Sequence, residues 1–257
     1  MARSGVWART HRLLAAAVLG LIMAGLTRAR AAPRVPKPGV HGELGAGLSS
    51  SSGVALTTSI NSADRLRDNV GLWSYGGNLN YNYFSYNSAV GVNRFVAQVQ
   101  ARRMFTGAPV NFAVARVRYD HNLFNGYDYY LVETLDVGRR VINGKRMHLD
   151  LEIGGGARQN AYPGARPSDD EPVADGGLNY VGTMRPGTRF SERVSVMGAR
   201  TGTLITSVTG VTTTLIFHLA LKFSEQVIHY TSLPSTALMH YARTTTFTTL
   251  NLIYHIG

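Results

Sequence analysis

The fold of this chain is constrained most by an alternation of apolar and polar residues with a period of two. Its clearest example runs from Trp73 to Tyr83, where one face has mostly aromatic and aliphatic side chains and the other has serine, glycine and asparagine. A similar alternation recurs over 94–102 and 147–153. Because successive side chains of a strand point to opposite faces, the pattern predicts β-strands with one apolar and one polar face.

Two-faced strands occur in soluble β-sandwiches and in membrane β-barrels, and the connections between the strands favour a barrel. Outer-membrane barrels have an even number of antiparallel strands, short periplasmic turns and longer outside loops. With both termini in the periplasm, the short connections at 142–145, 186–187 and 217–218 fall inside, and the two longest, 159–172 and 231–243, fall outside. The twelve candidate strands lie at 40–49, 53–64, 70–84, 92–105, 110–122, 127–140, 146–158, 173–185, 188–200, 204–216, 219–230 and 244–256.

We therefore predict an all-β fold, an antiparallel transmembrane β-barrel of about twelve strands. Ten strands are the alternative, since the segments before Leu66 are weakly patterned. Aromatic side chains lie near both ends of the predicted strand that includes Trp73, among them Tyr81 and Tyr83. This placement is typical of the two interfacial girdles of aromatic residues in such a barrel. A soluble β-sandwich with an aromatic core is the competing fold, although globular strands usually run only about 5 to 6 residues.

The N-terminal segment is predicted to be a cleaved export signal. Residues 1–12 are basic without an acid, an uncharged run follows to Leu26, and Ala29-Arg30-Ala31 supplies the small-x-small pattern of a cleavage site. An uncleaved anchor is the alternative, because arginines are unusual just ahead of a cleavage site. We therefore expect a signal peptide over residues 1–31 and one barrel domain over residues 32–257.

The charge balance does not indicate a nucleic-acid partner. The chain has 26 basic and 15 acidic side chains, but five arginines leave with the signal, so the mature excess is 21 minus 15, or +6. The remaining arginines are scattered along strands, whereas a nucleic-acid-binding protein is expected to have a dense basic stripe. Because the chain has no cysteine, it can form neither a disulfide nor a thiolate metal site.

Two motifs are similar to those of a known family. Residues 118–129 read RYDHNLFNGYDY and resemble the Arg-Tyr-Asp-Arg-Asp-x-Phe-Asp-Gly-x-Asp-Tyr hairpin of the DUF481 family of salt-induced outer-membrane proteins, and LEIGGGAR at 151–158 resembles its Leu-Glu-x-Gly-x-Gly-x-Arg strand. The resemblance covers about 92–256. It departs from the family at Val137-Gly138-Arg139-Arg140, where Gly-x-Gly-Tyr-Arg is usual, and in the absence of an acid before the last strand. The resemblance implies an outer-membrane barrel without a settled biochemical activity.

Charged residues of neighbouring strands are expected to share the barrel lumen. Arg116, Arg118 and Asp120 lie on one face of their strand, and Asp150 and Glu152 lie on the corresponding face two strands later. We expect this face to be the lumen, because an arginine facing lipid at the bilayer midplane costs about 2 to 4 kcal/mol.

This charged group has two interpretations. It forms either a constriction that tunes ion passage, as charged rings do in channels, or a salt-bridge network that fills a narrow lumen, with Glu152 in reach of Arg116 and Arg118. On the strand between, Glu133 or Asp136 is expected to face inward as well. A twelve-strand lumen lies between the filled interior of about eight strands and the open channel of about sixteen.

Patterns for catalysis and metal binding are weak. A barrel that hydrolyses lipid needs a nucleophilic serine with a histidine in reach. The nearest pairs, His229 with Ser232 and His240 with Ser235, lack the His-x-Ser spacing that places both side chains on one strand face. The acidic run Asp169-Asp170-Glu171 could bind Ca²⁺ or Mg²⁺ in an outside loop, although such a run is more often simply solvated. We predict no catalytic residue, no metal and no cofactor.

The predicted function is that of a noncatalytic outer-membrane β-barrel, either structural or a narrow porin-like channel, linked to salt or osmotic stress. The alternative is an outer-membrane enzyme that modifies lipid. The expected location is the outer membrane of a Gram-negative type of cell, and the expected partners are outer-membrane lipid and the barrel-assembly machinery. Gly154-Gly155-Gly156 lacks the end of a phosphate loop and is expected to permit close strand packing.

Overall fold

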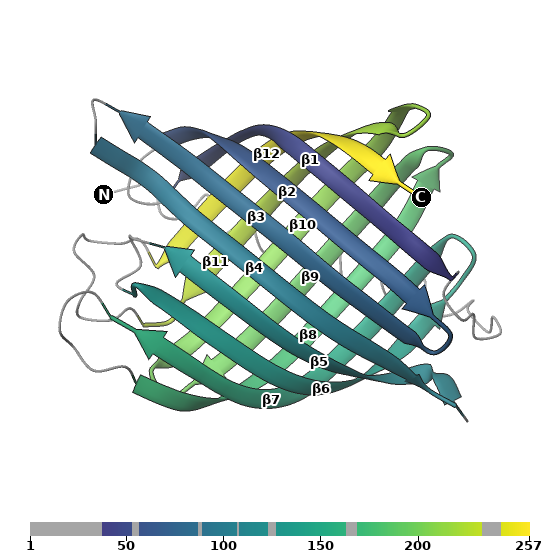
Figure 1. Cartoon of the computed structure of the whole chain (residues 1–257), viewed down its shortest axis with the longest axis horizontal. Helices are drawn as coiled ribbons and strands as arrows, with labels where there is room; N and C mark the ends of the chain where they lie inside the picture. Colours follow the sequence, from purple (N-terminus) through teal and green to yellow (C-terminus); the bar gives the residue numbers. More distant parts are fainter. Residues whose placement is uncertain are drawn as a thin grey trace, which may run out of the picture.

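The fold is a closed antiparallel barrel of twelve strands (Figure 1), as predicted. The computed structural model describes residues 38–52, 57–86, 89–106, 108–122, 127–162, 169–232 and 243–257, so the export signal expected at 1–31 lies outside the described residues. The strands are β1 (Gly39–Ser52), β2 (Thr57–Val70), β3 (Trp73–Tyr86), β4 (Ala89–Phe105), β5 (Ala108–Asn122), β6 (Tyr129–Asn143), β7 (Met147–Ala161), β8 (Asp169–Arg185), β9 (Thr188–Ala199), β10 (Gly202–Ile216), β11 (Leu219–Tyr230) and β12 (Thr244–Ile256).

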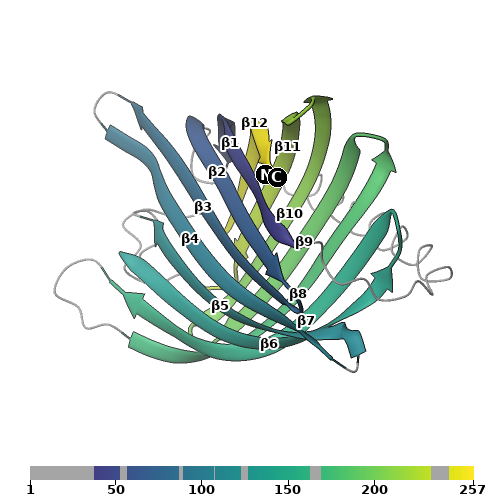
Figure 2. The same cartoon turned by 45° about the vertical axis from the view of Figure 1, so that its right-hand side comes forward.

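The barrel is closed by pairing of the first strand with the last. Gly47 of β1 pairs with Asn61 of β2 on one side and with Asn251 of β12 on the other. Figures 1 and 2 show the tilted strands curving round into one continuous wall. Closure leaves no free sheet edge, which is the condition under which a sheet can cross a bilayer with its backbone groups paired.

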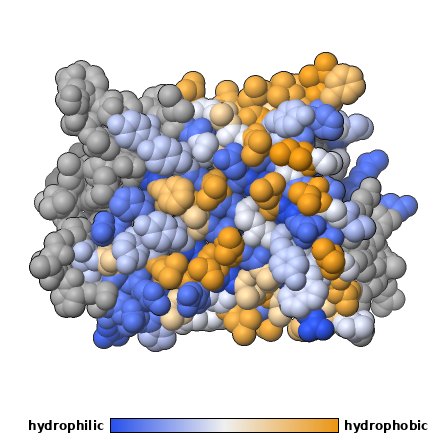
Figure 3. Space-filling view, viewed as in Figure 1, coloured by the Kyte–Doolittle hydropathy of each residue, from blue (hydrophilic) through white to orange (hydrophobic). Residues whose placement is uncertain are grey.

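The two faces of the wall have opposite polarity. Large aliphatic side chains point outward and are exposed, with Val99 at 60%, Leu135 at 67% and Ile153 at 69%. Figure 3 shows apolar side chains across one outer face, with polar groups between them. Charged groups such as Asp120 and Asp150 are instead buried inside. A soluble protein buries its large aliphatic residues, whereas an outward apolar band is the arrangement of a barrel surrounded by lipid.

No helix of the described residues is long and apolar enough to span a membrane. One end of the barrel, at the right in Figure 1, has the short turns. β6 and β7 are joined by Gly144 to Arg146, with the Gly144 amide donating to the Met147 carbonyl at 2.8 Å. β8 and β9 are joined through Gly187, whose φ of +77° favours glycine. The short connections predicted from the sequence are confirmed.

The boundaries of β2 differ from those predicted. This strand was expected at 53–64 but runs Thr57–Val70, so residues 65–70 belong to it. The prediction is wrong here because the outer face of β2 has Asp64 and Asp68 instead of apolar residues, which hides the alternation. The Asp64 carboxylate accepts a hydrogen bond from the Gly45 amide of β1 at 3.2 Å.

The predicted outside connections are shorter than expected where the structure describes them. β7 extends to Ala161 and β8 begins at Asp169 rather than at 173, so the acidic run Asp169-Asp170-Glu171 lies in a strand. Residues 163–168 and 233–242 lie outside the described residues. Their location outside the cell stays a prediction.

Candidate functional site

The candidate site is the barrel lumen, and all five residues predicted to line it lie on the inner face of the wall. Strand alternation places Arg116, Arg118 and Asp120 of β5 on that face, together with Asp150 and Glu152 of β7. They do not form one continuous network. Instead the structure divides them among three separate clusters of ion pairs.

The first cluster surrounds Asp120, whose side chain is 1% exposed. Arg94 of β4 donates to both carboxylate oxygens, from Nε at 3.2 Å and from Nη2 at 2.7 Å. Arg118 donates at 2.9 Å and the Tyr130 hydroxyl at 2.8 Å. Two guanidinium groups and a phenol therefore hold a single buried carboxylate, which compensates its desolvation.

The second cluster is centred on Arg116. Its guanidinium contacts Glu152 at 2.7 Å, Asp136 at 3.0 Å and Asp175 of β8 at 3.3 Å. Glu152 thus lies against Arg116 and not against Arg118, which pairs with Asp120. The arginine ties β5 to three following strands across the inside of the wall.

The third cluster binds Asp150 between two arginines. Arg140 of β6 donates to its two oxygens at 2.7 and 3.0 Å, and Arg102 of β4 donates at 2.8 Å. The Arg102 guanidinium also lies 3.4 Å from the ring centroid of Phe112, a fully buried residue of β5. This stacking allows a charged group to be buried beside an aromatic ring.

A fourth ion pair involves the acidic run Asp169-Asp170-Glu171, which the sequence analysis considered as a cation site in a loop. Glu171 points inward, pairs with Arg158 and accepts hydrogen bonds from Asn160 at 2.9 Å and from the Thr201 amide at 3.0 Å. Asp169 lies 3.3 Å from the exposed Arg200. These two carboxylates of the run therefore already have protein partners, and no group of His, Asp or Glu suited to a metal ion occurs within the described ranges.

Close strand packing beside the second cluster requires glycine. Asp136 is the inward carboxylate of β6, while Glu133 points outward and is exposed. A Cβ atom at Gly154 would collide with the Asp136 side chain, and one at Gly156 would collide with the Glu133 carbonyl. The structure agrees with the expectation that this glycine run permits close packing.

A cluster of apolar side chains lies in the lumen toward the end away from the short turns. Val132, Met197, Leu204 and Ile228 pack there with buried tyrosines. These residues come from β6, β9, β10 and β11, so the cluster extends over much of the wall. Sequence reasoning did not identify it, because its members are single apolar residues on otherwise polar strand faces.

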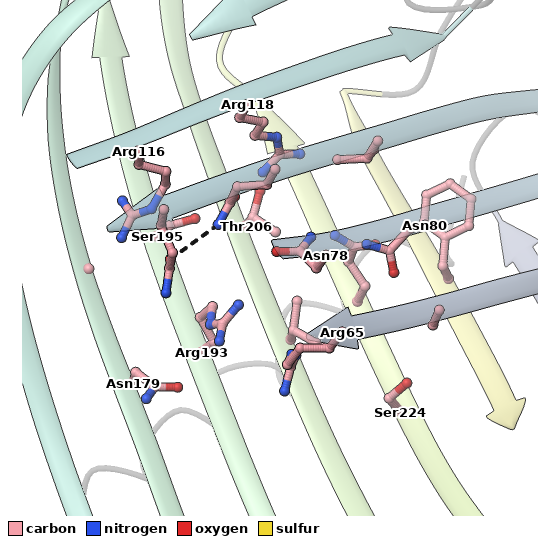
Figure 4. Close-up of a pocket in the computed structure, with 18 of the residues that line it drawn as sticks. Arg65, Asn78, Asn80, Arg116, Arg118, Asn179, Arg193, Ser195, Thr206 and Ser224 are labelled. Atoms are coloured by element: carbon pink, nitrogen blue, oxygen red, sulfur yellow. Dashed lines mark hydrogen bonds between the residues drawn. The ribbon is translucent and has the colours of Figure 1, made fainter. Parts of the chain in front are cut away.

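Next to that cluster, on the side toward the short turns, the lumen contains a cavity of about 320 Å³ lined by eight basic and four acidic residues. Besides Arg94 and Arg102, four more of the basic side chains were not predicted as site residues: Arg65, Arg67, Arg193 and Lys222. Figure 4 shows Arg65 and Arg193 converging on the same space, with Arg116 and Arg118 above them. Arg65 and Arg67 were missed because the predicted second strand ended at residue 64. The other two were on predicted strands, where the available signal was a single cation at an inward position.

The residues considered for catalysis have other partners. The His229 ring nitrogen Nδ1 lies 2.8 Å from the Thr244 hydroxyl, and the Ser232 hydroxyl donates to the Thr201 carbonyl. Neither hydrogen bond joins the histidine to the serine. The second pair considered, His240 with Ser235, lies outside the described residues.

Comparison with known proteins gives a family and a fold. A NanC porin aligns over 82% of this chain and 98% of its own, with 7% identity and a TM-score of 0.53. A KdgM porin aligns over 84% of this chain and 99% of its own, with 8% identity and a TM-score of 0.46. The first likeness shows a shared barrel fold. No curated protein matches the sequence. The family model described as "Protein of unknown function, DUF481" matches residues 44–256.

Proposed function

This chain belongs to the DUF481 family, and from that membership and the geometry of its barrel we propose that it is a noncatalytic outer-membrane protein that acts as a narrow channel. The porin fold and the apolar outer face support the location. A link to salt or osmotic stress stays a prediction, based on the family resemblance alone.

The observation that supports a channel most strongly is the charged cavity inside the closed wall. Arg67 and Arg193 line it and are exposed to it, although both belong to inward faces of strands. A filled, purely structural lumen would bury such cations against acidic partners, as the wall of β4 to β8 does. Charged side chains that face water inside a barrel are the elements that select ions in channels.

A structural barrel without conductance is the second candidate, and the apolar cluster favours it. Val132, Met197, Leu204 and Ile228 are each less than 10% exposed, and the first three also line the cavity. Hydrophobic constrictions of this kind gate channels by excluding water. A channel with this cluster is therefore expected to have a small conductance with long closed periods.

Recording of single channels in planar bilayers tests the proposal. Protein purified from outer membranes, with folding verified by the shift of its gel band on boiling, is expected to give discrete small current steps. Met197→Ala with Leu204→Ala should increase the open time or the step size. Silent bilayers with folded wild-type protein and with this variant would overturn the channel proposal in favour of the structural barrel.

An assay of lipid hydrolysis on the same sample tests the enzymatic alternative, since release of fatty acid would contradict a noncatalytic protein.

A further inference from the structure

We propose that Arg65, Arg67, Arg193 and Lys222 form a binding site for small anions on one wall of the lumen, and that this site makes the protein select anions over cations. The selectivity rests on the channel proposed above, whereas the binding site does not. These four residues are called the cationic wall below. The ligands expected are small solutes with carboxylate, phosphate or sulfate groups.

The cationic wall lacks the acidic partners that the rest of the lumen has. Among the described residues, Arg67, Arg193 and Lys222 form no ion pair. Arg65 lies 3.7 Å from Glu43, in a pair whose side chains are 43% and 26% exposed. An ion pair that is long and solvated contributes little. Four cations that line the same cavity therefore have at most one weakly bound carboxylate.

The four cations are also close enough to act on one another. Arg193 is repelled electrostatically by Arg65, Arg116 and Arg67, and Lys222 is repelled by Arg65 and Arg193. Glu152, the acid of β7 that attracts Arg193 from two strands away, is bound to Arg116 at 2.7 Å. Glu43 is the carboxylate that attracts Arg67 and Lys222, and it also lies against Arg65, so one acid is shared among these cations. The repulsion that remains is relieved when an anion binds between the cations, so this arrangement favours anions in the cavity.

The strand pairing places the cationic wall at a defined level of the lumen. Arg67 lies three residues before the end of β2 at Val70, and Lys222 lies three residues after the start of β11 at Leu219. Both are thus near the end with the short turns, on the side of the cavity away from the apolar cluster.

Neutral hydrogen-bond donors surround the four cations. Asn78 is the strand partner of Arg65, and Asn179 is the strand partner of Arg193. Figure 4 shows both amides beside the two guanidinium groups. Arginine and amide donors together match the oxygens of carboxylate and phosphate groups, and they offer a potassium ion no negative charge.

The acidic residues of β9 and β11 point outward, which strengthens this interpretation. Glu192 of β9 and Glu225 of β11 alternate with the cations of their strands and point away from the lumen. Glu192 is 4% exposed and accepts hydrogen bonds from Ser207 at 2.7 Å and from Thr209 at 2.5 Å. The strands that provide Arg193 and Lys222 therefore place their acids where they cannot neutralise the cavity.

The reversal potential in a gradient of KCl tests the inference. The wild-type protein is expected to pass chloride in preference to potassium. A unit charge about 8 Å from the ion path changes the local concentration of each ion by about twofold in water, in opposite directions for chloride and potassium. Each lost charge should therefore lower the chloride-to-potassium permeability ratio about fourfold, and Arg193→Gln with Lys222→Gln should lower it about sixteenfold. The experiment is run at low salt, because screening weakens the effect at high ionic strength.

The matched control removes the same charge from the outer face. Arg103 and Arg139 are exposed and alternate away from the lumen, so Arg103→Gln with Arg139→Gln should leave the ratio unchanged. A conducting wild-type protein that prefers potassium, or a ratio that the Arg193 and Lys222 variant does not lower, would overturn anion selection and leave the channel standing.

A binding measurement separates the site from the channel. If folded protein gives no current, the channel proposal fails, and the anion site is tested by the temperature at which the gel band shifts. Phosphate should raise this temperature relative to chloride at equal ionic strength, and the rise should be lost in the variant of Arg193 and Lys222. An equal temperature in both media would overturn the anion site itself.

Discussion

Replacement of Asp120 by asparagine is expected to be among the most damaging conservative changes in this barrel. The carboxylate is 1% exposed and contacts two arginines, of which Arg94 has a side chain only 6% exposed. Asparagine keeps the size but removes the charge, and it replaces one acceptor oxygen by an NH2 group that cannot accept from the arginine and tyrosine donors. The change therefore leaves Arg94 buried in the lumen without its counter-ion, while Arg118 is 24% exposed and can be partly solvated.

The expected loss follows from this burial. Removing one partner of a buried ion pair costs roughly 3 to 5 kcal/mol, because the remaining charge is not compensated. The free energy of unfolding, measured by urea titration of protein in lipid vesicles, should fall by that amount, and the band shift should occur at a lower temperature. Adding Arg94→Met should recover part of the loss, since the variant then has no uncompensated buried guanidinium.

A matched control makes this prediction specific. Asp170 of β8 is exposed and has no ion pair within the described part of the chain. Asp170→Asn, the same chemical change, should alter stability by no more than about 0.5 kcal/mol. If Asp120→Asn costs no more than this control, or if Arg94→Met adds to the loss, the buried pair does not stabilise the lumen as argued.

Three further predictions concern packing and topology. Glu152→Gln should cost about 1 to 3 kcal/mol by the same urea titration, less than the change at Asp120 because its side chain is 18% exposed. Gly156→Val should abolish the boiling-dependent band shift, since its Cβ would collide with the facing strand, whereas Gly198→Ala, with open space around it, should fold normally. A cysteine at Arg200 should react with an impermeant thiol reagent on intact cells and one at Lys145 should react only after the outer membrane is broken; the reverse pattern would invert the topology.

The barrel could be predicted from the sequence because apolar residues must face lipid and polar residues must face the lumen, and this requirement makes the two kinds of residue alternate along each strand. Strands such as β3 have aromatic residues on one face and asparagine on the other, and their number followed from short connections such as Pro186-Gly187. The second strand was placed wrongly because Asp64 and Asp68 occupy its outer face. Asp64 is tolerated there because it bonds to the Gly45 amide, a contact between strands that no local pattern reveals.

The site was predicted less completely than the fold. The inward face of Arg116, Arg118 and Asp120 followed from period two, but the partner of each charge depends on register and side-chain reach across strands. Arg94 and Tyr130, which complete the buried cluster around Asp120, come from the two strands beside β5. The cationic wall is assembled from β2, β9 and β11, and only closure of the barrel brings these strands around one cavity.

Thiol accessibility along a single strand tests the central claim most directly. The claim is that the wall separates water inside from lipid outside, and the chain has no native cysteine to interfere. In β4, Gln98 and Gln100 line the cavity while Val99 points outward and is 60% exposed. With the protein in lipid vesicles, a charged thiol reagent should modify cysteines at 98 and 100 but not at 99. Equal modification at all three, or modification at 99 alone, would contradict a lipid-embedded barrel with a solvated lumen.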